Sequence, residues 1–214
     1  MLNIAVLVSG GGTNLQALID AQGRGEIAQG RISCVIASRP DAYALERAKK
    51  AGIPTEILVR KNFESGEAYD DALISTLERY QTDLVVLAGF MTIISDRVIH
   101  RFQEKMINVH PALIPSFCGP GYYGLRVHEA ALKAGVKVTG ATVHFVNEIC
   151  DGGPIILQKA VAVEDGDTPE VLQRRVMEQA EWKLLPKAVS LFCEGRLCVQ
   201  GSWVKILEKE NGVS

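Results

Sequence analysis

Two polar side chains leave the end of one short apolar run, and their types suit acid–base chemistry. Asn108 and His110 follow Lys105-Met106-Ile107, a run that is typical of a buried strand. Residues two apart in an extended segment point to the same side. A neutral amide and a titratable imidazole would therefore face one point, where they could stabilise a developing oxyanion and move a proton.

The carboxylate that such a histidine needs stands further along the chain. Asp151 opens the sequence Asp-Gly-Gly-Pro between two apolar runs, and it either caps its own turn or orients and charges His110. His110 is one of four histidines, and a lone histidine is more often packed or solvated than catalytic. The catalytic interpretation is favoured by the position after a strand, by Asn108, and by the stiff exit that Pro111 and Pro115 make.

No serine or cysteine stands in the setting of a nucleophile. Ser9 is not flanked as in a G-x-S-x-G elbow, and nothing around Cys118 indicates a lowered thiol pKa. No HExxH motif or paired histidine ligands occur, so we expect no metal. An amide, an imidazole and a carboxylate without a nucleophile indicate direct acyl transfer to an amine. Asn108 and protonated His110 would hold the oxyanion, and Asp151 would stabilise the imidazolium and help remove the amine proton.

A glycine-rich loop follows the first apolar run. Residues 9–14 read Ser-Gly-Gly-Gly-Thr-Asn, ahead of an amphipathic stretch. Glycines permit backbone conformations that strain other residues, and free amides at a helix N-terminus attract an anion. The spacing is not GxGxxG, because Leu15 stands at the third glycine position, and no lysine follows as in a Walker loop. We expect a lone phosphate monoester here; the alternative is a tight turn capped by Thr13 or Asn14.

Composition and charge are those of a globular protein of one domain. The chain has 214 residues, 47% hydrophobic and 22% charged, with a net charge of −2 and no block of Lys or Arg, which argues against a nucleic-acid surface. Five cysteines without a CxxC pair fit a reducing compartment. The N-terminus lacks a basic region, and its apolar run is too short for a signal sequence or membrane span. We expect a cytoplasmic protein.

Short apolar runs alternate with amphipathic stretches in the first half. Strands are predicted over residues 4–8, 32–37, 56–59, 84–88 and 106–109, and helices from Leu15, over 42–51 and over 68–80. Continuous Val/Ile/Leu strands between helices predict a parallel sheet covered on both faces. After Gly119 the pattern predicts a helix over 127–134, strands over 138–146 and 155–163 that pair antiparallel, a helix over 168–185 and a last strand over 199–206.

The predicted fold class is therefore α/β. One domain spans residues 1–214, with a Rossmann-like, doubly wound and mostly parallel half over 1–108 and a mixed half over 109–214. The first half carries the expected phosphate loop, and the second half carries most of the expected catalytic residues.

Five segments in register resemble one family. Residues 9–15, 87–91, 108–111, 138–145 and 151–155 resemble phosphoribosylglycinamide formyltransferases, the folate-dependent enzymes of de novo purine synthesis. The resemblance covers nearly the whole chain in order and spacing. It implies a formyltransferase fold in which 10-formyltetrahydrofolate, the co-substrate, donates its formyl group to the amine of 5-phosphoribosylglycinamide. It also makes residues 109–214 the half that carries catalysis and the folate loop.

The resemblance assigns site residues, each beside a plainer alternative. The catalytic trio would be Asn108, His110 and Asp151. The acceptor would be held by a phosphate loop and by an acidic ribose contact: Gly12, Thr13, Asn14 and Glu181. The formyl-folate would contact a wall and a loop that closes over the pterin: Leu87, Met91, Thr92, Ile93, Ile94, Asn108, Asn147, Glu148, Ile149, Cys150 and Asp151. In the plainer alternative, the apolar residues of the wall belong to the hydrophobic core, and Glu181 is a solvated charge on a helix.

Some positions depart from well-known members of that family. Thr92 stands where they carry an arginine, and Gly66 replaces another arginine near the glutamate tail of the folate. Arg126 replaces a histidine, although His128 remains, and the loop over 118–124 is longer than in some members. These changes put side-chain contacts to the folate tail in question and leave the trio untouched. Pterin recognition through the backbone of residues 92–94 would survive them.

Related functions differ in features that this sequence does not show. A methionyl-tRNA formyltransferase would carry a further C-terminal domain and a basic surface, and a formyltetrahydrofolate hydrolase an N-terminal regulatory domain. A sugar-nucleotide formyltransferase fits the loop over 10–14 less well, and a non-catalytic nucleotide-binding module would bind phosphate ligands without turnover. We expect two small-molecule substrates as partners, no nucleic acid or membrane, and a monomer or homodimer.

Overall fold

The computed structural model describes residues 1–209. The strands are β1 (Leu2–Val8), β2 (Gly30–Ala37), β3 (Thr55–Ile57), β4 (Leu84–Leu87), β5 (Met106–His110), β6 (Val138–Phe145), β7 (Ile155–Ala162), β8 (Leu197–Gln200) and β9 (Trp203–Ile206). The helices are α1 (Thr13–Gly23), α2 (Ala44–Lys50), α3 (Gly66–Arg79), α4 (Asp96–Arg101), α5 (Leu125–Lys133), α6 (Pro169–Val176) and α7 (Trp182–Cys193), with a 3-10 turn η1 (Arg60–Asn62) and a π-helical turn η2 (Met177–Glu181). None of these helices is long and apolar enough to cross a membrane.

All of these strands belong to one sheet. Their order is β3-β2-β1-β4-β5-β6-β7-β9-β8. β1 pairs in parallel with β2 and β4, and the parallel pairs β2–β3 and β4–β5 extend the sheet on either side. β6 runs antiparallel to both β5 and β7. The predicted α/β fold, doubly wound and mostly parallel at first and mixed later, is confirmed; the last five residues of the expected domain, 210–214, lie outside the described part.

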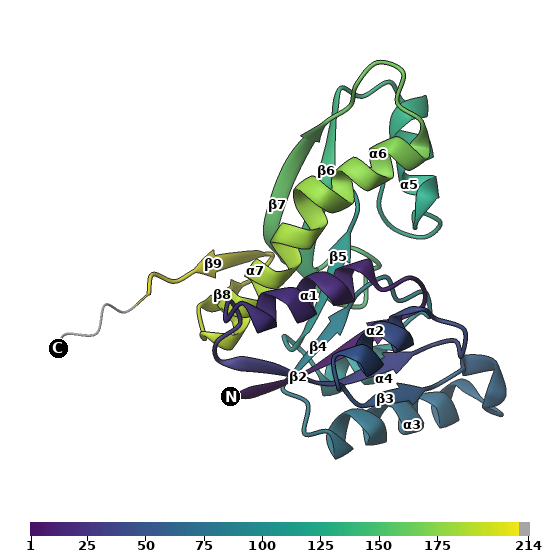
Figure 1. The fold of residues 1–214 in the computed structure, drawn as a ribbon, viewed down its shortest axis with the longest axis vertical. Helices are drawn as coiled ribbons and strands as arrows, with labels where there is room; N and C mark the ends of the chain where they lie inside the picture. The colour runs from purple at the N-terminus through teal and green to yellow at the C-terminus, as the bar shows by residue number, and fades with distance from the viewer. Residues whose placement is uncertain (210–214) are drawn as a thin grey trace.

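The alternating side chains of β1 show why helices cover both faces of the sheet. Ile4 and Val6 pack in one core with α1, α2 and α7, whereas Ala5 and Leu7 pack in another with α3 and α4 (Figure 1). All four are fully buried. Full burial of one such leucine stabilises the fold by about 2 kcal/mol. A strand between two helical layers therefore has to be apolar along its whole length.

The second half of the sheet extends away from the parallel part. β6 and β7 form a long antiparallel pair flanked by α5 and α6 (Figure 1), as the sequence predicts. The prediction of one strand over 199–206 is wrong. Gly201 has a φ of 63°, the chain reverses there, and β8 and β9 pair as an antiparallel hairpin. Only Gln200, Gly201 and Ser202 separate the apolar residues of the two strands, and the glycine permits the reversal.

Two helical features differ from the sequence-based prediction. The helix predicted over 168–185 is interrupted by η2 and then continues as α7 to Cys193, with Pro186 inside it. One widened turn hardly changes the spacing of apolar residues, so periodicity does not detect it. α4 is absent from the prediction because it is short and buries only Val98 and Ile99.

The topology gathers the polar loops at one edge of the sheet. β1, β4 and β5 are parallel neighbours, so the loops after them leave from the same edge. Ligands usually bind there in doubly wound sheets. β6 pairs antiparallel with β5, with His144 opposite Asn108, so β6 ends beside the start of β5. From the connection that follows, Asp151 reaches the side chains of Asn108 and His110.

Candidate active site

Asn108, His110 and Asp151 meet at the end of β5. His110 Nδ1 lies 3.4 Å from Asp151 Oδ2. The Asn108 amide donates a hydrogen bond of 3.4 Å to Asp151 Oδ1. The His110 side chain is only 4% exposed. The sequence names these three side chains, and the fold brings them together, although Asp151 belongs to a distant part of the chain.

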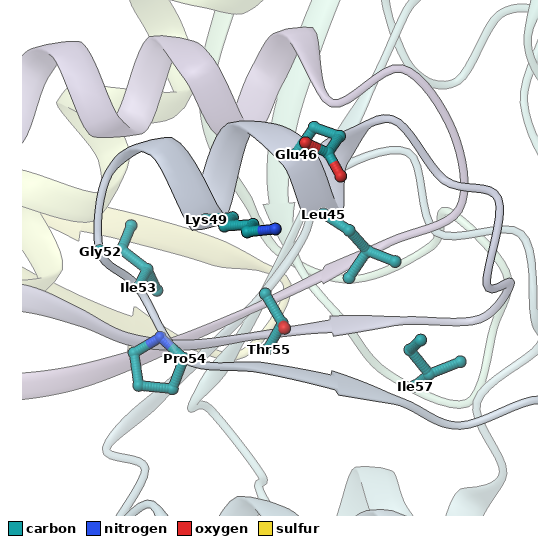
Figure 2. A pocket seen from close by; sticks show the side chains of 8 residues that line it. All are labelled: Leu45, Glu46, Lys49, Gly52, Ile53, Pro54, Thr55 and Ile57. Atoms are coloured by element: carbon teal, nitrogen blue, oxygen red, sulfur yellow. The ribbon is translucent and has the colours of Figure 1, made fainter.

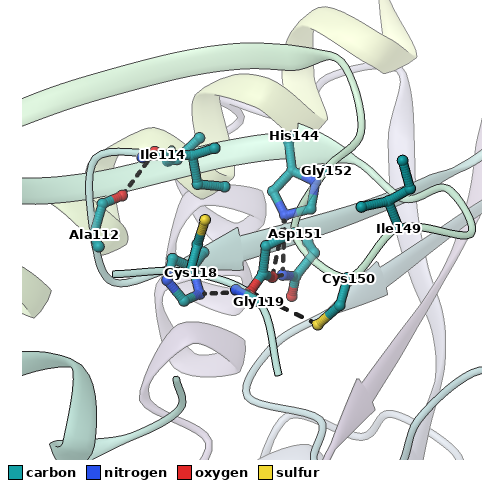
Figure 3. Close-up of polar contacts among 12 residues, drawn as sticks. Ala112, Ile114, Cys118, Gly119, His144, Ile149, Cys150, Asp151 and Gly152 are labelled. Atoms are coloured by element: carbon teal, nitrogen blue, oxygen red, sulfur yellow. Dashed lines mark hydrogen bonds and ion pairs between the residues drawn. The ribbon is translucent and has the colours of Figure 1, made fainter. Parts of the chain in front are cut away.

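Asp151 is fixed by its backbone and by a neighbouring amide. Its φ is 55°, a left-handed conformation that is uncommon for residues other than glycine. Its Oδ2 accepts a hydrogen bond of 2.9 Å from the Gly119 amide, as Figure 3 shows. A side chain at Gly153 would collide with the carbonyl oxygen of Phe145. Glycine there lets the turn approach the end of β6 and so places the carboxylate beside β5.

His144 belongs to this cluster and was not among the residues named from the sequence. Its Nδ1 lies 2.7 Å from the carbonyl oxygen of Phe145. A carbonyl only accepts, so Nδ1 carries the hydrogen and Nε2 accepts from the Asn108 amide at 3.2 Å. His144 therefore orients the amide of Asn108. The signal that could have identified His144 is its position directly opposite Asn108 in the antiparallel pair of β5 and β6. That position is not known until the strand register is known.

The surroundings of His110 keep its imidazole neutral and ready to accept a proton. Its Nε2 donates to the carbonyl oxygen of Phe117 at 2.8 Å, so Nδ1 is the titrating nitrogen and faces Asp151. Burial lowers the pKa of His110 below its usual value, and nearby His144 lowers it further, against the opposing effects of Asp151 and the Phe117 bond. A proton taken up by Nδ1 would lie against the Asp151 carboxylate.

Asp151 stays ionised in this buried cluster. Burial by itself raises the pKa of the carboxyl group, but the two neighbouring histidines and the Gly119 amide outweigh burial and hold the pKa below its usual value. A permanent negative charge beside a neutral, buried imidazole is the arrangement that stabilises an imidazolium formed during a reaction.

The glycine loop presents an uncapped helix N-terminus. Gly12 is the N-cap of α1, with a φ of 71° and no side-chain hydrogen bond, so neither Thr13 nor Asn14 caps the helix. A Cβ at Gly12 would lie 2.6 Å from the Cβ of Ala44, so glycine also permits the close approach of α2. The amides of the first turn remain available to an anion.

Glu181 faces this loop from the π-helical turn η2. Its Oε2 accepts a hydrogen bond of 2.7 Å from Asn14 Nδ2. The side chain is 6% exposed, which excludes the alternative of a solvated helix charge. Burial raises its pKa to about 7, against the opposing effect of the Asn14 hydrogen bond. The second polar atom of Asn14, Oδ1, is buried without a partner in the described part of the chain.

Comparisons with known proteins identify the family. A family model described as formyl transferase matches residues 2–189. A phosphoribosylglycinamide formyltransferase of Haemophilus influenzae is 45% identical over 92% of this chain and 90% of its own length. The chain belongs to the phosphoribosylglycinamide formyltransferase family. The resemblance predicted from five segments is confirmed.

Further members of the family agree in sequence and fold. The phosphoribosylglycinamide formyltransferase of Escherichia coli is 43% identical over 92% of this chain and 89% of its own length. The crystal structure of glycinamide ribonucleotide transformylase 1 from Symbiobacterium toebii superposes with a TM-score of 0.91 at 45% identity, and covers 97% of this chain and 95% of that chain.

The apolar segment assigned to the folate from the family resemblance divides into core and surface. Leu87 is buried, and Ile94 packs against the same core. Met91 is exposed, and Ile93 is 93% exposed. The alternative that these are all core residues therefore holds for Leu87 and fails for Met91 and Ile93. Thr92 lies between them, partly buried.

The loop after β6 is ordered by its own polar groups. Asn147 Oδ1 accepts a hydrogen bond of 3.1 Å from the Ile149 amide. Glu148 pairs with His100 of α4 at 2.7 Å. Ile149 and Cys150 are exposed. The loop therefore offers an apolar side chain on a preformed turn, tied to α4.

Ser9 and Arg47 connect the glycine loop to its neighbours. Ser9 Oγ accepts a hydrogen bond of 2.7 Å from the Met91 amide, so the glycine loop contacts the segment that the resemblance assigns to the folate. Arg47 Nε donates to the Gly11 carbonyl at 2.8 Å, and its Nη1 donates to Gln16 Oε1 at 3.1 Å. Nothing in the sequence indicates that α2 lies against this loop, so Arg47 was not among the residues named from the sequence.

Arg126, which departs from the family pattern, and His128, which remains, have different surroundings in α5. Arg126 lies over the ring of Tyr123, with 4.9 Å from Cζ to the ring centre. His128 is fully buried, and neither of its ring nitrogens has a hydrogen-bond partner within residues 1–209. Burial lowers the pKa of His128 to about 4, and the charge of His110 acts in the same direction. His128 is therefore a neutral packing residue behind the cluster.

The pocket drawn in Figure 2 is not the candidate site. It has a volume of about 500 Å³ and is lined by α2 and the segment around β3. None of its lining residues belongs to the trio, the glycine loop or the folate segment. Over residues 1–209, no group of three or more His, Cys, Asp or Glu side chains is arranged to hold a metal ion.

Proposed function

We propose that this chain transfers the formyl group of 10-formyltetrahydrofolate to the amine of 5-phosphoribosylglycinamide in de novo purine synthesis. The observation that carries the proposal is the buried pair of His110 and Asp151 beside Asn108, at the sheet edge that also holds an uncapped helix N-terminus. Family membership supports the same pair of substrates.

The trio acts on the tetrahedral intermediate. The acceptor nitrogen bonds to the formyl carbon, and the carbonyl electron pair moves to oxygen. Asn108 and protonated His110 stabilise that oxyanion; Asn108 does so with the amide hydrogen that now makes a bond of 3.4 Å to Asp151. The acceptor nitrogen loses a proton, and the folate nitrogen gains one as its bond to carbon breaks, so the exchange is balanced.

His110 and Asp151 carry the proton between these nitrogens. The neutral imidazole takes the proton on Nδ1, and the adjacent carboxylate stabilises the imidazolium until the leaving nitrogen is protonated, through a water molecule where the distance requires one. Because Asp151 is held by Gly119 and by its turn, the charge is in place before the reaction.

The acceptor binds at the glycine loop. The free amides of Gly12, Thr13 and Asn14 bind the phosphate, and Glu181 accepts a hydrogen bond from a ribose hydroxyl. Arg47 adds positive charge beside this loop and holds the Gly11 carbonyl away from the phosphate.

The folate binds between the two exposed apolar segments. Met91, Ile93 and Ile149 contact its rings, and the backbone of residues 92–94 and 147–151 recognises the pterin. In this assignment residues 1–108 form the phosphate-binding half and 109–214 the catalytic and folate-loop half. We place the protein in the cytoplasm, because all five cysteines are free thiols, and expect a monomer or homodimer.

Incubation with both substrates tests this function. The protein, 10-formyltetrahydrofolate and 5-phosphoribosylglycinamide should give formylated acceptor and tetrahydrofolate in equal amounts. Release of formate without formylated acceptor would indicate a hydrolase instead. Folded protein that binds the acceptor but gives neither product would identify a binding module.

A further inference from the structure

Arg60, in η1, holds its guanidinium over an aromatic ring without an acidic partner. Its Cζ lies 5.7 Å from the centre of the Tyr69 ring. Two carboxylates of α3 are engaged elsewhere, since Asp70 accepts from Ser95 at 2.7 Å and Asp71 pairs with Arg97. Glu64 and Glu67 are exposed and make no ion pair with Arg60 within residues 1–209. Within residues 1–209 the Arg60 side chain has no ion pair, and the residue is exposed. A positioned cation is therefore available to a ligand.

Gly66 makes room for this guanidinium. A Cβ built on Gly66 would lie 3.0 Å from Arg60 Nη2 and 3.9 Å from Arg60 Cζ. Gly66 is the first residue of α3, where any L-residue could follow the Ser65 cap. A larger side chain would compete with Arg60 for the same space. The cation that the family resemblance places at position 66 is missing, and another cation stands beside it.

The same guanidinium lies near the proposed folate segment. Tyr69 is fully buried beneath Arg60, and burial raises its pKa to about 12. Tyr69 packs in the same core as Leu87 and Ile94 of the folate segment, and its hydroxyl is buried without a hydrogen-bond partner within residues 1–209. Thr92 stands between the exposed Met91 and Ile93. The core shared by Ile94 and Tyr69 therefore connects the exposed apolar segment to the free positive charge of Arg60.

We propose that Arg60 binds a carboxylate of the glutamate tail of the formyl-folate donor, in place of the arginines absent at positions 66 and 92. This inference rests on the proposed function. The donor has apolar rings followed by one or more glutamates, and the protein offers Met91 and Ile93 followed by a guanidinium. Arginine binds carboxylates in a bidentate geometry, and stacking on an aromatic ring fixes its plane beforehand.

The phosphate of the acceptor is a less suitable partner for Arg60. The glycine loop and α1 belong to the core on one face of the sheet, whereas Tyr69 and α3 belong to the core on the other face. Arg47 already stands beside the glycine loop. Arg60 accordingly serves the donor and makes the enzyme prefer donors that carry glutamate.

A comparison of donors with and without glutamate tests Arg60 directly. Arg60→Met keeps the aliphatic stem and removes the charge, and Lys61→Met, at an exposed cation next to it, is the matched control. Calorimetry without acceptor measures the Kd for 10-formyltetrahydropteroate, 10-formyltetrahydrofolate and its triglutamate. Arg60→Met should raise the Kd for the two glutamate-bearing donors about 10-fold and leave the pteroate donor unchanged. Lys61→Met should match the unsubstituted protein.

A second variant guards against a purely structural effect. Arg60→Met vacates the space beside Gly66, so adding Gly66→Arg to it should restore binding of the glutamate-bearing donors. The inference is wrong if Arg60→Met weakens all three donors equally or changes none of them. Loss of transfer to the acceptor in the unsubstituted protein would overturn the proposed function alone, because donor binding is measured without acceptor.

Discussion

At the scale of single residues, the site depends on one carboxylate that serves two side chains. Asp151 lies 3.4 Å from His110 Nδ1 and accepts from Asn108 at the same distance. A buried carboxylate in that place stabilises an imidazolium and orients an amide, which an uncharged group of the same shape cannot do.

Asp151→Asn is expected to lower turnover strongly and to leave binding nearly unchanged. An amide next to His110 Nδ1 removes the charge that stabilises the protonated imidazole, so kcat should fall by about four orders of magnitude. Single-turnover kinetics and calorimetric binding of each substrate measure the two effects. Asp165→Asn, the same substitution at an exposed carboxylate outside the site, is the control and should retain turnover. A loss of less than tenfold for Asp151→Asn would remove the trio from the mechanism.

The pH dependence of His110 follows from its burial. The pKa of His110 lies below its ordinary value of 6.5, so kcat/KM should fall as pH drops through that lower pKa and not at 6.5. Asp151 raises this pKa, so Asp151→Asn should shift the His110 titration to lower pH still, as NMR of the imidazole protons measures. A titration at or above 6.5 in the unsubstituted protein would contradict the buried, neutral imidazole.

Glu181 should make the protein without substrates less stable as pH rises. Its pKa is about 7 when folded and 4.5 ordinarily, so the folded state holds the proton more tightly. The contribution of Glu181 to the free energy of unfolding is therefore fully present below about pH 4.5, and it is lost as pH rises through about 7. Glu181→Gln should leave the free energy of unfolding unchanged at the acid end and raise it by a few kcal/mol at mildly alkaline pH.

Denaturant unfolding at both pH values measures this effect. Glu178→Gln, at an exposed side chain in the same turn that pairs with Arg174, is the control and should show no such difference. Glu181→Gln should also raise the KM for the acceptor, because a neutral amide is a weaker acceptor of a ribose hydrogen bond than a carboxylate. Equal stability of both proteins at every pH would contradict a buried Glu181.

At the scale of elements, the glycine loop combines steric and electrostatic requirements. A side chain at Gly12 would meet Ala44, whereas one at Gly11 meets nothing within 4 Å. A charge placed at Gly11 therefore tests the phosphate site without disturbing the fold. A substitution at Gly12 would affect the phosphate site and also disturb the packing against α2.

Gly11→Asp should raise the KM for the acceptor at least tenfold through repulsion of the phosphate. Gly11→Ala adds a Cβ without charge and should bind the acceptor as the unsubstituted protein does. Steady-state kinetics with the folate held saturating measure both variants. An unchanged KM for Gly11→Asp would exclude the loop from the acceptor site.

Helices and strands were predictable from the sequence where their apolar pattern is long. They were not predictable where a single turn interrupts a helix or reverses a strand. β1 and α3 follow from continuous and periodic apolar residues. The π turn that carries Glu181 and the reversal at Gly201 do not, because one widened turn and a break of three residues alter the apolar pattern too little to be recognised.

The geometry of the site was predictable from residue spacing only within one segment; Asp151 was named as a partner of His110, but their contact depends on the fold. Asn108 and His110 share a side because they are two residues apart on β5. His144, Arg47 and Arg60 reach their places from other elements, and only the three-dimensional register shows this.

At the scale of the whole molecule, the two halves of the sheet form one working unit. Asn14 of the first half binds Glu181 of the second, and Asn108 at the end of the parallel strands meets Asp151 after the antiparallel strand β6. Phosphate loop and folate segment share the Ser9–Met91 contact. The sites proposed for the acceptor and the donor therefore lie on one continuous frame, which would fix the distance between amine and formyl carbon.

The central claim is direct transfer of the formyl group without a formylated protein. Rapid-quench measurement of a single turnover, with an isotopically labelled formyl group on the folate, tests it most directly. The label should pass from folate to the amine of the acceptor in one phase, with none bound to protein at any time. Label on the protein before it reaches the acceptor, or label released as formate, would contradict the account.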